Sequence, residues 1–150
     1  MTKIALAIAV VAGMSPMSQS FPSVQNNQAT IVNSGSTNTS GFRIAVKRSG
    51  SAEYASIPRG AGAQDKQPET AGREIPNELA TSLFADLEAA KPLAALPAPH
   101  CMKSRSFGTR LTIEFGGEST PDLSCGDGGN EHLRALIKDV RETVALFRAK

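Results

Sequence analysis

Two cysteines, Cys101 and Cys125, carry the most definite chemistry in the sequence. His100 directly precedes Cys101, and an imidazole beside a thiol can favour the reactive thiolate. A thiol- or His-dependent enzyme centred on these two residues is therefore one alternative, although adjacent side chains rarely face each other. In an oxidising compartment, an even number of cysteines instead indicates pairing. We predict a Cys101–Cys125 disulfide, which would stabilise the fold by about 3.5 kcal/mol through chain entropy.

Basic side chains gather around the first cysteine. His100, Lys103, Arg105 and Arg110 lie within 11 residues that contain no Asp or Glu. A basic loop that is exposed and anchored by a disulfide is suited to an acidic surface on a partner. Solvated charge without a partner is the alternative. We take these four residues as a candidate partner-binding loop, with a protein as the expected partner.

Acidic side chains gather around the second cysteine, in residues 122–132. This stretch holds Asp122, Asp127, Glu131 and His132 among several glycines, a composition that can bind calcium or a small ligand. The spacing departs from that of the EF-hand loop, and the glycines form no phosphate-binding motif. A connector that leads into a helix is the simpler interpretation, and a small-ligand or metal-binding protein remains the alternative.

No pattern in the sequence identifies catalytic machinery. Serines are plentiful, but no G-x-S-x-G motif is present. Neither histidine has a recognisable catalytic partner nearby in the sequence. We predict no catalytic residue, no metal ligand and no cofactor, and we expect a non-enzymatic protein rather than an enzyme.

The N-terminus resembles an export signal. Lys3 precedes the apolar run 4–12, and Ser18 and Ser20 place small side chains before a cleavage point ahead of Phe21. The run is shorter than the ~20 residues that cross a bilayer. We therefore predict a signal peptide over residues 1–20 and an exported protein, periplasmic or secreted, with no membrane span after signal removal.

Composition limits the remaining classes of function. The chain has 150 residues, of which 40% are hydrophobic and 20% are charged, values typical of one globular domain. The net charge of +2 is too small for a general nucleic-acid binder. We predict a polar N-terminal segment over 21–41 and a single domain over 42–150, with no nucleic acid as partner.

Alternating apolar residues predict two β-hairpins. Strand 42–48 is expected to turn through three residues into strand 52–57, with Val46 opposite Tyr54. Strand 109–115 is expected to turn through three residues so that Phe115 faces Ser119. Pro121 cannot donate to a strand ladder, which predicts that the returning strand lies at a sheet edge. Residues 29–32 predict a fifth, short edge strand.

Two amphipathic helices complete the predicted fold. The first covers 76–91, with Pro76 at its first position, and the second follows Asn130 as N-cap. Residues 58–74 contain almost no large apolar side chain and predict a mobile surface loop. The order of elements predicts an α+β two-layer sandwich, an antiparallel sheet of two hairpins covered on one face by both helices.

The same elements resemble a class of exported bacterial domains of unknown function. The matching segments are GFRIAVKRSGSAEY, PNELATSLFADLEAAKPLAAL, FGTRLTIEFGGESTPDLSC and LRALIKDVRETVALF, which together span about residues 40–148. Those domains share a hairpin, an acidic helix with a phenylalanine, a second hairpin with a glycine turn and a final amphipathic helix. The resemblance implies a small exported bacterial domain and assigns no activity.

Overall fold

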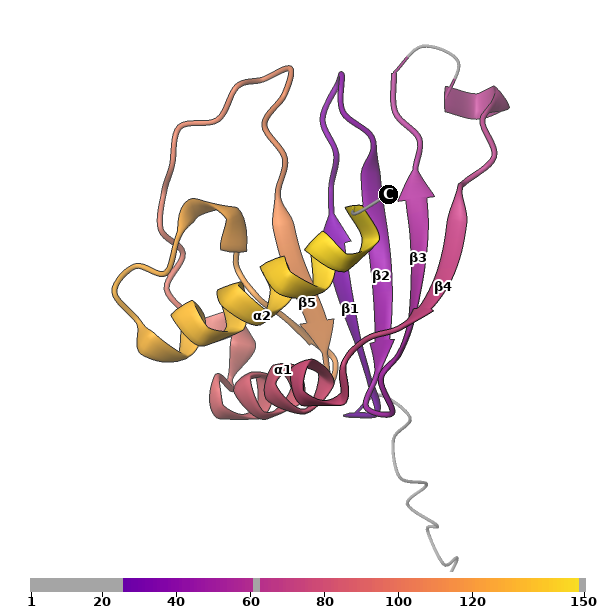
Figure 1. Cartoon of the computed structure of the whole chain (residues 1–150). Coiled ribbons are helices and arrows are strands. Elements are labelled where there is room, and N and C mark those ends of the chain that lie inside the picture. Colours follow the sequence, from indigo (N-terminus) through magenta and orange to yellow (C-terminus); the bar gives the residue numbers. More distant parts are fainter. Residues whose placement is uncertain (1–25, 61–62, 149–150) are drawn as a thin grey trace, which may run out of the picture.

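The structure, a computed structural model, describes residues 26–60 and 63–148. The predicted signal peptide, residues 1–20, lies outside these ranges. A six-stranded antiparallel sheet in the order β4-β3-β2-β1-β5-β6 carries two α-helices on one face (Figure 1). The strands are β1 Gln28–Asn33, β2 Gly41–Lys47, β3 Ser51–Ile57, β4 Thr70–Glu74, β5 Leu111–Phe115 and β6 Glu118–Ser119. The helices are α1 Asn77–Ala89 and α2 Glu131–Arg148, with short 3₁₀ turns at η2 Ala63–Asp65, η3 Leu93–Ala95 and η4 Leu123–Cys125. The predicted α+β two-layer sandwich is confirmed.

Three isoleucines in register form the centre of the sheet's inner face. Ile31 in β1 lies opposite Ile44 in β2 and Ile113 in β5, and none of the three is accessible to solvent. Each buried side chain of this size stabilises the fold by about 1.5–3 kcal/mol. The helices cover this face with buried side chains from α1 (Leu79, Ala80, Leu83, Phe84, Leu87) and α2 (Leu133, Leu136, Ile137, Val140, Val144).

Residues 29–32 were predicted as a short strand at an edge of the sheet, and this prediction for β1 is wrong. Strand β1 is a central strand, paired with β2 on one side and β5 on the other. It thereby joins the two predicted hairpins into one sheet. The sequence shows only a short apolar stretch here, because strand order depends on contacts between residues far apart in the chain.

The register of the first hairpin differs by two residues from the prediction. Val46 lies opposite Ala52, and Tyr54 lies opposite Ile44. The turn has three residues, 48–50, as expected, but it begins one residue earlier. Gly50 adopts φ +92, a conformation that side chains rarely allow, which fixes the turn there. A shift of two residues preserves which side chains face inward.

The turn of the second hairpin is shorter than predicted. Phe115 pairs with Glu118 rather than Ser119, so only Gly116 and Gly117 form the turn. Both have positive φ, 62 and 83, as a two-residue type I′ turn requires. Strand β6 then ends after two residues, and Leu123 lies in η4. The edge position of this returning strand is confirmed.

Part of the predicted loop 58–74 is a strand. Its last five residues form β4, which pairs with β3 at the sheet edge opposite β6. Every residue of β4 is exposed, and backbone hydrogen bonds pair it with β3. The Arg73 guanidinium also donates to the Leu146 carbonyl of α2 and lies over the Phe147 ring. Pairing through the backbone leaves no hydrophobic pattern in the sequence. Helix α1 begins at Asn77, one residue later than predicted, because Pro76 is the N-cap residue and not the first residue of the helix.

Candidate functional site

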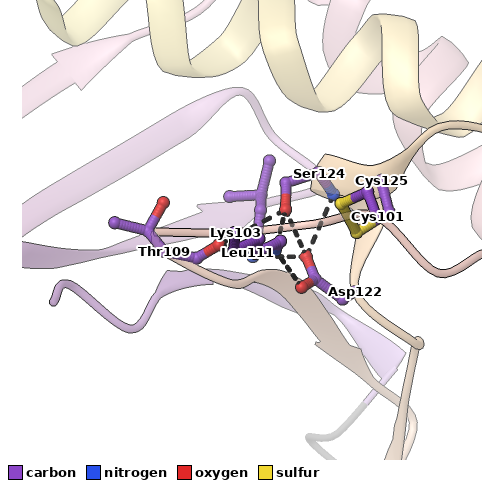
Figure 2. The surroundings of a disulfide bond; sticks show 7 residues. All are labelled: Cys101, Lys103, Thr109, Leu111, Asp122, Ser124 and Cys125. Atoms are coloured by element: carbon purple, nitrogen blue, oxygen red, sulfur yellow. Dashed lines mark hydrogen bonds and ion pairs between the residues drawn. A yellow bond between two sulfur atoms is a disulfide. The ribbon is translucent and has the colours of Figure 1, made fainter. Parts of the chain in front are cut away.

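The candidate site is the segment from His100 to Arg110, which we name the basic loop. It precedes β5 and is joined to η4 by the disulfide between Cys101 and Cys125, whose sulfur atoms are 2.03 Å apart (Figure 2). The predicted disulfide is present, and neither cysteine is a free thiol. The alternative enzyme centred on His100 and Cys101 therefore has no thiolate in this structure.

Lys103 is the internal anchor of the basic loop. Its ammonium group forms an ion pair with Asp122 and donates hydrogen bonds to the Thr109 carbonyl at 2.6 Å and Ser124 Oγ at 2.5 Å (Figure 2). The carboxylate of Asp122 also accepts from the backbone N–H of Leu111 at 3.1 Å. Lys103, one of the four residues predicted for partner binding, therefore holds the basic loop in place.

The electrostatics of Asp122 reflect this anchoring. Burial alone would raise the pKa of its carboxyl group, but hydrogen bonds from Lys103, Ser124 and backbone N–H groups outweigh that effect and lower the pKa to about 2. Asp122 is therefore ionised at neutral pH and neutralises Lys103. The pair contributes little net charge to the surface that a partner would meet.

The loop between β1 and β2 supports the basic loop from the side. Ser36 Oγ donates to the Ser106 carbonyl at 2.7 Å, and the Asn38 N–H donates to the same oxygen at 3.1 Å. At the end of the basic loop, the Arg110 carbonyl accepts a hydrogen bond from the Ser34 N–H at 2.9 Å. The basic loop is therefore held at its start by the disulfide, at its centre by Ser106 and at its end by Arg110.

Two apolar side chains project from this supported loop. Met102 is fully exposed and Phe107 is 66% exposed, and they are the large hydrophobic side chains that stand out into solvent in the described part of the chain. Sequence reasoning missed them, because periodicity identifies apolar residues only in helices and strands. The signal that could have found them is a large apolar residue in a Pro- and Ser-rich segment, where no periodic pattern includes it.

The remaining basic residues of the loop are exposed. His100 and Arg110 line an open groove of about 510 Å³ that follows the disulfide and also includes Lys103 and Asp122. Arg105 is exposed but does not line this groove. Three of the four predicted residues therefore share one surface hollow, and the unpaired charge of that hollow is positive.

The acidic stretch 122–132 offers no open carboxylate cluster. Asp127 accepts from the Gly129 N–H at 2.9 Å and from Arg134 Nε at 2.6 Å, and these bonds lower the pKa of its carboxyl group. Asn130 caps α2 as predicted, its side chain accepting from the Leu133 N–H at 2.9 Å. Within residues 26–60 and 63–148, no three His, Cys, Asp or Glu side chains are grouped so that they could hold a metal ion.

None of the described helices combines the length and the apolar character needed to cross a membrane. No protein-family model and no curated protein matches this chain.

Proposed function

We propose that this chain is an exported, non-enzymatic module that binds a protein partner through the basic loop. The observation that carries the proposal is the exposure of Met102 and Phe107 on a loop that the disulfide and Lys103 hold in place. A loop that is already ordered loses less entropy when it binds. Burial of these two apolar side chains against a partner would be favourable, which supports a role in contact with one.

The composition of the loop supports a particular kind of partner. Methionine, phenylalanine and arginine are enriched at protein interfaces, where apolar side chains fill pockets and charges surround them. Met102 and Phe107 would supply the apolar contacts, and the exposed Arg105 and Arg110 would supply the surrounding charge. The expected partner surface therefore has an apolar pocket bordered by acidic residues.

Export supports the same function. The predicted signal peptide would deliver the chain to an oxidising compartment, periplasmic or extracellular, where a disulfide persists. The Cys101–Cys125 bond is compatible with such an environment.

The test compares variants of the mature chain, immobilised in oxidised form and exposed to the exported protein fraction of its host. The wild type should retain a partner that the variant Met102→Ser/Phe107→Ser loses. Arg105→Ser should weaken retention and its dependence on salt, whereas Arg141→Ser, which removes an exposed arginine on α2, should not. Equal retention by all four proteins would contradict the proposal.

A further inference from the structure

A buried carboxylate in α2 lacks a hydrogen-bond donor. Asp139 is only 3% exposed, and its Oδ2 atom has no hydrogen-bond partner among the described residues. A buried, ionised oxygen without a partner is costly, by several kcal/mol for an isolated charge. Neither the proposed interface nor the hydrophobic core requires a carboxylate at this position.

A second carboxyl group lies beside it. Asp86, half-buried in α1, is close enough to Asp139 in the packed helix pair for the two carboxyl groups to share a hydrogen bond. Two ionised carboxylates are both acceptors, so a hydrogen bond between them requires a proton on one of them. Burial is the largest cause that raises the pKa of Asp86, and the charge and hydrogen bonding of Asp139 raise it further.

We propose that Asp86 and Asp139 form a proton-binding site across the contact between α1 and α2, where one shared proton tightens the packing of the two helices as the pH falls. The other charged groups that act on Asp86 are His132 and Lys138, both on α2. They favour the ionised form of Asp86 and so oppose proton uptake, but their effects rank below those of burial and Asp139. This site is independent of the basic loop.

The direction of the effect follows from proton linkage. Because the pKa of Asp86 is raised in the folded protein, this carboxyl group holds its proton more tightly in the native state than in the unfolded chain. The added stability is fully present below the unfolded pKa of 3.8 and is lost as the pH rises through the folded value. Once the shared proton is lost, the charge of Asp139 opposes the ionised form of Asp86.

Thermal unfolding of the oxidised chain between about pH 4 and pH 7 tests the proposal, since Asp122 stays ionised in the folded state over this range. Asp139→Asn removes the repulsion and should raise the melting temperature at pH 7 by about 2–4 °C over the wild type. The difference should shrink as the pH falls, because the wild type then takes up its shared proton. Glu142→Gln, an exposed control on α2, should show no such pH-dependent difference, and His132→Gln should keep the wild-type pH dependence.

Carbon-13 NMR titration of the wild type gives a readout that does not depend on a variant folding. Asp86 should titrate above 3.8. Titration at or below that value would overturn the proposal, as would a pH-independent effect of Asp139→Asn. A rise in the wild-type melting temperature with millimolar Ca²⁺ at pH 7, absent in Asp139→Asn, would also overturn it, because the occupant would then be a metal ion.

Discussion

The ammonium group of Lys103 lies against the carboxylate of Asp122, next to the disulfide between Cys101 and Cys125 (Figure 2). The side chains of this pair are 24% and 21% exposed, so both charges are largely removed from water. This ion pair and the disulfide join the same two stretches of the chain, the basic loop and the segment around η4. Their combination keeps the basic loop in one conformation while its apolar side chains stay in solvent.

Removing the cation should destabilise the fold. In Lys103→Met, Asp122 keeps its backbone donors but loses its charged partner, and the free energy of unfolding should fall by about 1–2 kcal/mol. Urea denaturation of the oxidised protein measures the change. Lys66→Met, at an exposed position just after η2, is the matched control and should change it by less than about 0.5 kcal/mol.

The lowered pKa of Asp122 predicts loss of stability in acid. The unfolded value is 3.8 and the folded value is about 2, so the contribution of this carboxylate is fully present above 3.8 and is lost as the pH falls through about 2. It amounts to about 2 kcal/mol at neutral pH. Asp122→Asn should be less stable than the wild type at pH 7 and nearly equal to it near pH 2. A difference that does not change between these pH values would contradict the assignment.

Loss of the disulfide should both destabilise the chain and free the loop. Cys101→Ser/Cys125→Ser should lower the free energy of unfolding by roughly 3 kcal/mol. Trypsin should then cut after Arg105 faster than in the oxidised wild type, as measured by mass spectrometry of early fragments. Adding a reductant to the wild type should reproduce both effects and leave the double variant unchanged; a reductant-sensitive variant would exclude the disulfide as the cause.

The elements with a clear hydrophobic pattern were predictable from the sequence, and the elements held by backbone pairing were not. Alternation in β2 and β5 and the long apolar stripe of α2 predicted their positions, and the even number of cysteines in a chain predicted to be exported indicated the disulfide. Strand β4 and the central place of β1 depend on hydrogen bonds between distant backbone segments, which side-chain types do not reveal. The registers of both hairpins differ from the prediction because glycines with positive φ determine where each turn lies.

The candidate site was also predictable only in part from the sequence. Its composition could be predicted, since a run of basic residues beside a cysteine is visible in the sequence. The separate role of Lys103 could not, because its partners Asp122 and Ser124 lie 19 and 21 residues away, beyond a hairpin. The sequence shows which charges are present, and only the fold shows which of them are neutralised.

A glycine in the basic loop offers a test that alters the loop and leaves its charges intact. The Gly108 N–H donates to the Ser104 carbonyl at 2.7 Å, and a Cβ atom at Gly108 would lie 2.5 Å from that oxygen and 2.7 Å from the Cβ of Lys103. Gly108→Ala must therefore displace the backbone of the loop. Faster trypsin cleavage after Lys103 and Arg105, together with weaker partner retention, is the expected result.

Gly72→Ala is the matched control for this change, because a Cβ atom there meets nothing within 4 Å. It should leave cleavage and retention at wild-type levels, and its stability should be equal or slightly higher, since alanine restricts the unfolded chain. If Gly108→Ala retained the partner as well as Gly72→Ala while its loop was cut faster, a fixed loop conformation would not be needed for binding. Met102 and Phe107 would then act from a flexible segment, and the proposed advantage of the disulfide and Lys103 for binding would be wrong.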